Sequence, residues 1–164
     1  MLSLILKLDN MKFYSIFYRL NLYGQDLFYH LSGWDSNIQD FVQDKNQLPL
    51  LWLVALGTAL CVFVFYYFIL NHPRVNRLWH WFIALAIPVL SVFLYSRGLV
   101  MADINGASMH PIDPTLNIAS NNATMFGLYN GVLSGIFFFL LSIAFRFVSK
   151  NCKNTPFKSL INRK

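Results

Sequence analysis

The sequence contains no glutamate, and only 12% of its 164 residues are charged. Soluble domains carry about 25% charged residues, so this composition is not that of a soluble protein. The missing glutamate excludes catalysis by a pair of Glu carboxylates. The two cysteines, Cys61 and Cys152, lie in a hydrophobic run and in the C-terminal basic segment. This placement predicts neither a disulfide scaffold nor a cysteine-based metal site.

Three long uncharged runs account for much of the 56% hydrophobic content, and they cover residues 48–70, 78–96 and 123–145. A helix of about 20 apolar residues crosses the ~30 Å hydrocarbon core of a bilayer. Pro88 in the second run predicts a kink. We therefore expect an all-α integral membrane protein with three transmembrane helices and no soluble domain.

Glycines recur every four residues in the third run, at Gly127, Gly131 and Gly135. Residues at this spacing share one helix face, and missing side chains there allow the backbone of another helix to approach. Asn130 and Ser134 flank this face and can add hydrogen bonds between helices. The pattern predicts close helix packing, either with a second copy or with a helix of the same chain.

Residues 12–33 show helical periodicity with one polar line. Its most informative members are Arg19, Tyr23, Asp26 and His30. The segment suits an amphipathic helix lying in the membrane interface. It equally suits a fourth span whose ionisable groups face a bundle interior or a pore, where His30 would make gating sensitive to pH near neutrality. We favour the fourth span.

The basic residues predict the orientation in the membrane. Six Lys or Arg residues lie in the segment 146–164 and two lie in the turn 71–77, whereas the loop 97–122 contains only Arg97. Loops rich in Lys and Arg stay in the cytoplasm. We expect a multi-pass protein of the cell (inner) membrane with a cytoplasmic C-terminal tail. The loop 97–122 and the acidic connection 34–47 then face the other side.

The sequence shows no motif that predicts catalysis. The run Gly106-Ala107-Ser108-Met109-His110-Pro111 resembles the box around the nucleophilic serine of type I signal peptidases, but the loop 97–122 has no lysine to act as its general base. The histidines lack metal-ligand spacing. We expect no enzymatic activity, no cofactor and no bound metal. The basic tail follows a membrane span, which indicates orientation in the membrane and not binding to nucleic acid.

A glycine face on one helix and a polar line on another are typical of small oligomeric membrane proteins. The leading hypothesis is a homo-oligomeric channel or pore, for example a defence or stress effector. One version of this hypothesis adds a separate partner that gates the pore. The alternative is a non-conducting anchor, assembly or immunity subunit that binds another membrane or cytoplasmic protein. Frequent Asn, Lys, Phe and Tyr residues suggest an AT-rich bacterial or phage gene.

Overall fold

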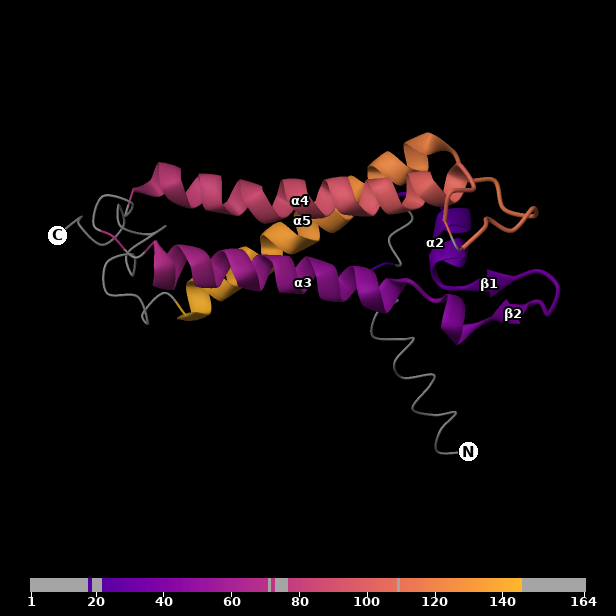
Figure 1. Cartoon of the computed structure of the whole chain (residues 1–164), viewed down its shortest axis with the longest axis horizontal. Helices are drawn as coiled ribbons and strands as arrows, with labels where there is room; N and C mark the ends of the chain where they lie inside the picture. The colour runs from indigo at the N-terminus through magenta and orange to yellow at the C-terminus, as the bar shows by residue number, and fades with distance from the viewer. Residues whose placement is uncertain (1–17, 19–21, 71, 73–76, 109, 146–164) are drawn as a thin grey trace, which may run out of the picture. The chain divides into compact units, whose positions relative to one another are not determined.

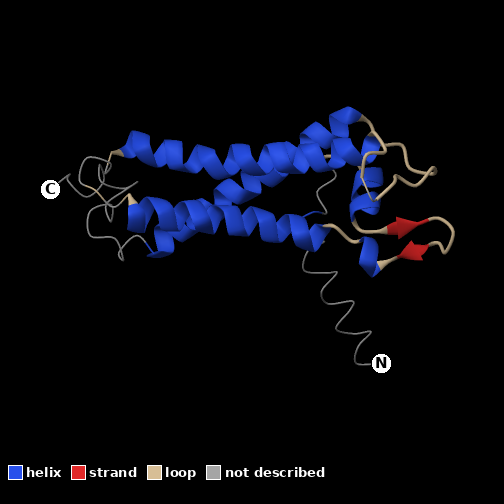
Figure 2. Ribbon diagram, in the orientation of Figure 1, coloured by secondary structure: helices blue, strands red, loops and turns tan. Residues whose placement is uncertain are grey.

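The computed structural model describes residues 18, 22–70, 72, 77–108 and 110–145. Most of these residues are helical (Figures 1 and 2). The elements in chain order are α2 (Gln25–Leu31), β1 (Trp34–Asp35), β2 (Asp40–Phe41), the 3-10 helix η1 (Gln43–Lys45), α3 (Leu48–Val64), the π-helical turn η2 (Phe65–Ile69), α4 (Leu78–Ile104) and α5 (Ser120–Phe145).

Three segments of the described chain are long and apolar enough to cross a membrane. They cover Gln43–Ile69, Leu78–Ile104 and Ser120–Phe145, with 26 or 27 residues each. At 1.5 Å per residue, such a helix measures about 40 Å, which exceeds the ~30 Å hydrocarbon core. The prediction of a helical protein with three membrane-spanning helices is confirmed in this sense.

Helix α4 is longer than the sequence suggested. Residues 97–104 were expected in a loop, but α4 continues through them and ends at Ile104. The stop is Gly106, whose φ of 66° is left-handed. The Gly106 N–H donates to the Asp103 carbonyl, and the Ala107 N–H donates to the Ala102 carbonyl. These two bonds form a Schellman cap, which satisfies the last carbonyls of a helix.

The helix predicted over residues 12–33 is interrupted. Within it, the seven-residue helix α2 begins after Gly24. Gly24 has a φ of 95°, and a Cβ there would lie 2.4 Å from Nδ2 of Asn122. The same Asn122 amide donates to the Tyr23 carbonyl at 2.7 Å. The chain therefore breaks where it contacts α5, and a fourth span is not shown.

A short hairpin follows α2, where the sequence predicted only a polar connection. Strands β1 and β2 pair antiparallel, with Trp34 opposite Phe41. Gly33 allows the strands to start, because its φ is 86° and a Cβ would lie 2.3 Å from the Val42 carbonyl oxygen. Tyr29 of α2 packs on both cross-strand aromatic rings, with centroids 5.8 Å apart in each case.

The chain divides into two compact units. The first comprises residues 1–53 and 95–129, and the second comprises residues 54–94 and 130–164. The second unit has a core of small and aromatic side chains, namely Ala59, Phe63, Tyr66, Tyr67, Trp81, Ala84 and Phe138. The first unit holds most of the described polar residues. We call residues 22–47 and 97–122 of this unit the polar cap.

Candidate functional site

A buried ion pair joins the two segments of the polar cap. Nε2 of His30, on α2, lies 2.9 Å from Oδ2 of Asp103, in the last turn of α4. The side chains are only 6% and 1% exposed. The Gln47 amide, just before α3, donates to the same Asp103 oxygen at 3.4 Å. The Asp103 carboxylate of α4 therefore contacts a side chain of α2 and a side chain that precedes α3.

The position of Asp103 makes these partners necessary. A helix C-terminus carries partial negative charge, so a carboxylate in the last turn is disfavoured there. Burial adds a desolvation cost for the charged form. The His30 ring on α2 and the Gln47 amide, which precedes α3, offset both effects. The contact thus fixes α2 against the end of α4.

The other described residues of the predicted polar line, Tyr23 and Asp26, also have partners within the chain. The Tyr23 hydroxyl donates to the Tyr18 carbonyl. Burial, followed by the neighbouring Tyr129, raises the pKa of Tyr23 far above its usual value, so the hydroxyl stays protonated. Asp26 accepts the Asn117 N–H at 3.2 Å. Arg19 lies outside the described residues.

Two glycines of the predicted face of α5, Gly131 and Gly135, lie against α4 of the same chain. A Cβ on Gly131 would lie 2.7 Å from the Val89 carbonyl oxygen, and one on Gly135 would lie 2.8 Å from Cγ2 of Val89. Gly127 and Asn130 are buried as well. The structure thus provides an intrachain partner for the face, which the sequence left undecided.

A serine on the same helix contacts the first span, α3. The Ser134 hydroxyl donates to the Ala55 carbonyl of α3 at 2.8 Å. This carbonyl lies in a span, where an extra acceptor has no water to bond. In α5, Gly131 and Gly135 therefore contact α4, and the flanking Ser134 contacts α3.

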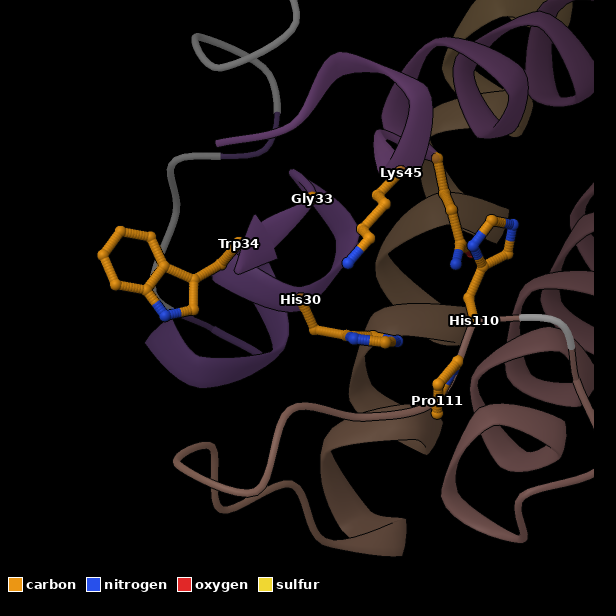
Figure 3. A pocket seen from close by; sticks show the side chains of 7 residues that line it. His30, Gly33, Trp34, Lys45, His110 and Pro111 are labelled. Atoms are coloured by element: carbon orange, nitrogen blue, oxygen red, sulfur yellow. The ribbon is translucent and has the colours of Figure 1, made fainter. Parts of the chain in front are cut away.

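The polar cap contains a small cavity next to the ion pair. Its volume is about 50 Å³, and it is lined by His30, Gly33, Trp34, Lys45, Gln47, His110 and Pro111. In Figure 3 the Lys45 ammonium points toward the His30 ring, with His110 and Pro111 across the cavity and the Trp34 ring turned away. The Gln47 carbonyl oxygen, Oε1, is buried and has no hydrogen-bond partner.

A second carboxylate links the hairpin to the loop between α4 and α5. Asp113 accepts the Ser36 N–H at 2.8 Å, and it accepts both the N–H and the hydroxyl of Thr115. These hydrogen bonds, the Thr115 hydroxyl first, hold the pKa of Asp113 far below its usual range. Asp113 therefore stays ionised and keeps the two cap segments together.

The serine of the signal-peptidase-like box is part of a local turn. The Ser108 hydroxyl donates to the His110 carbonyl at 3.2 Å and accepts the His110 N–H at 3.1 Å. Among the described residues, no three His, Cys, Asp or Glu side chains are grouped closely enough to hold a metal ion.

Sequence reasoning missed Asp103, Gln47, Lys45, His110 and Asp113 as partners in this cap. For Asp103 a signal existed, because apolar Leu99, Val100 and Met101 precede it and extend the helical run. An acid at the end of such a run lies at the membrane boundary and needs a partner. The others lie in irregular segments, where sequence spacing does not show what they contact.

Comparisons with known proteins give no information on function, so the functional argument rests on the geometry of the described residues. No protein-family model matches the chain, and the searches of curated proteins and of solved structures gave no significant match.

Proposed function

We propose that the chain is a non-conducting membrane subunit that acts by binding another protein through its polar cap. The observation that carries this proposal is the internal use of both features that had suggested a homo-oligomeric pore. The glycine face packs on α4, and His30 of the polar line binds Asp103. Among the described residues, Gly131, Gly135 and His30 therefore have partners within the chain and are not left to face a shared axis between copies.

The outer faces of the spans support the same conclusion. The exposed side chains of α3, α4 and α5 include large apolar groups on every helix, for example Leu53, Leu94 and Leu140. The runs 48–70, 78–96 and 123–145 contain no charged residue. An aqueous pore needs polar groups on the face that lines it. These faces suit contact with lipid.

The charge distribution supports the orientation proposed for the cap. Six of the seven aspartates lie in the polar cap, against two basic residues, Lys45 and Arg97. The turn 71–77 and the tail 146–164 contain eight Lys or Arg residues and no acid. We infer that the cap faces away from the cytoplasm, and that the C-terminal tail is cytoplasmic.

The hairpin of the cap has the composition of a protein-binding surface. Ile38, at the turn between the strands, is 60% exposed, and the half-buried Trp34 and Phe41 rings lie on the strands beside it. Asp40 and Asp44 are exposed next to them. Aromatic residues are enriched in protein interfaces, and acidic neighbours select a basic partner.

The test combines particle mass with site-specific crosslinking. Purified alone in nanodiscs, the full chain should have the mass of one copy and should carry no current across planar bilayers. When the chain carries a photo-crosslinking amino acid in place of Ile38 and is irradiated in native membranes, it should give one discrete protein adduct. The same group at the lipid-facing Leu94 is the matched control and should give none.

Charge reversal makes the result specific to the proposed surface. The double variant Asp40→Lys/Asp44→Lys should abolish the adduct from position 38 while leaving membrane insertion unchanged. A discrete homo-oligomer with measurable conductance would overturn the proposal and restore the pore hypothesis. An adduct that survives charge reversal would show that the hairpin charges do not select the partner.

A further inference from the structure

We propose that the cavity of the polar cap binds a small protonated oxyanion of the hydrogen phosphate class. The size of the cavity limits the ligand first. A single water needs about 10–15 Å³ of such space, so about 50 Å³ accommodates three to five non-hydrogen atoms. This is the size of phosphate or of the phosphate group of a monoester whose remainder stays outside.

The cationic and imidazole groups of the lining favour an anion over a cation. The Lys45 ammonium and the rings of His30 and His110 line the same cavity. Lys45 is ion-paired with Asp35 at 2.7 Å, but its side chain is 52% exposed. An exposed pair of this kind contributes little to stability, so the ammonium can be shared with a ligand.

The amide of Gln47 indicates that the anion carries a proton. Its nitrogen is already directed to Asp103, which fixes the amide orientation and leaves the carbonyl oxygen facing no donor. The residue is only 7% exposed, and a buried acceptor without a partner is unfavourable. A ligand that accepts from Lys45 and donates an O–H to Gln47 satisfies both groups, as hydrogen phosphate does and sulfate does not.

Two sources share this chemistry, namely free phosphate and the phosphomonoester headgroup of a lipid such as phosphatidic acid. The cavity residue Gln47 immediately precedes α3, and this position makes a lipid headgroup the second source. Phosphatidylcholine provides a phosphodiester without an ionisable O–H. It can therefore serve as the inert lipid of the experiment.

The test is equilibrium binding of inorganic phosphate to the full chain in phosphatidylcholine nanodiscs, with sulfate at equal ionic strength. We expect saturable binding of one phosphate per chain, and binding of sulfate at least about ten-fold weaker, because sulfate provides no hydrogen bond to Gln47. Lys45→Gln should weaken phosphate binding about ten-fold or more. Arg97→Gln is the matched control, since Arg97 is exposed and donates to Thr124 outside the cavity lining.

Each outcome decides the proposal. Phosphate that fails to saturate, sulfate that binds equally well, or Lys45→Gln that behaves as Arg97→Gln would overturn it and leave water as the occupant. If binding occurs, nanodiscs containing phosphatidic acid identify the source. Competition by this lipid indicates a headgroup site, whereas unchanged phosphate binding indicates a site for the free anion.

Discussion

Replacing Gly131 by alanine should destabilise the protein, because α4 approaches α5 there without an intervening side chain. The added Cβ would lie 2.7 Å from the Val89 carbonyl oxygen and 3.2 Å from Cβ of Phe93. Ordinary contact begins at 3.4 Å. The two helices must therefore separate locally by roughly 0.7 Å. The backbone oxygen of Val89 cannot rotate aside as a flexible side chain would.

The magnitude follows from two opposing terms. Overpacking of this kind costs about 1–3 kcal/mol. Alanine is better than glycine in a helix by up to about 1 kcal/mol, which offsets part of the loss. Gly57, in α3, is the matched control, because a Cβ there would meet nothing within 4 Å. The difference between Gly131→Ala and Gly57→Ala removes the helix term and should be about 1–3 kcal/mol.

The assay is reversible unfolding in mixed micelles with increasing dodecyl sulfate, followed by tryptophan fluorescence, alongside the particle mass in nanodiscs. Gly131→Leu should lower stability further and leave the mass at one copy. Equal stability of Gly131→Ala and Gly57→Ala would refute the contact between α4 and α5. A change of mass in Gly131→Leu without a change of stability would show that the glycine face binds a second copy.

Two further predictions concern the carboxylates of the cap. His30→Leu should lower the free energy of unfolding by about 3 kcal/mol, because it leaves the buried Asp103 charge without its ion pair. The double variant His30→Leu/Asp103→Leu should recover part of this loss. A double variant that is less stable than His30→Leu would contradict the ion pair. Because the pKa of Asp113 is lowered, its contribution to stability is complete above the usual Asp range and is lost only as the pH falls through the lowered pKa. The protection factor of the Ser36 N–H, which is the exchange rate of an unstructured amide at the same pH divided by its own rate, should therefore stay constant from pH 7 to about 4, and Asp113→Asn should lower it throughout.

The spans could be predicted because hydropathy is a local property of the sequence. Any helix of about 20 apolar residues is recognisable whatever it packs against. The extension of α4 was missed because Arg97 and Gly98 interrupt the apolar run. The helix nevertheless continues, since Val100 and Asp103 are both buried. Its true end depends on the left-handed Gly106, whose conformation the surrounding residues decide.

The polar line failed as a helix face for a related reason. Its periodicity assumed that Gly24 is helical, but this residue has positive φ where the chain meets Asn122. The Asn122 amide donates to the Tyr23 carbonyl, and these two residues are 99 positions apart in the sequence. Periodicity contains no information about such contacts. The strands of the hairpin could not be predicted, because a strand of two residues is too short to show an alternation of polar and apolar side chains.

The aspartates of the cap divide into two groups with different consequences. Asp26, Asp103 and Asp113 each join one cap segment to the other, through Asn117, His30 and Ser36 respectively. Their replacement would loosen the cap and would say nothing about a partner. Asp40 and Asp44 are exposed, and Asp40 accepts a local hydrogen bond from the Phe41 N–H. Charge reversal at these two positions therefore changes the electrostatic surface without removing a link between segments. Loss of partner binding in Asp40→Lys/Asp44→Lys would accordingly be attributable to the surface itself.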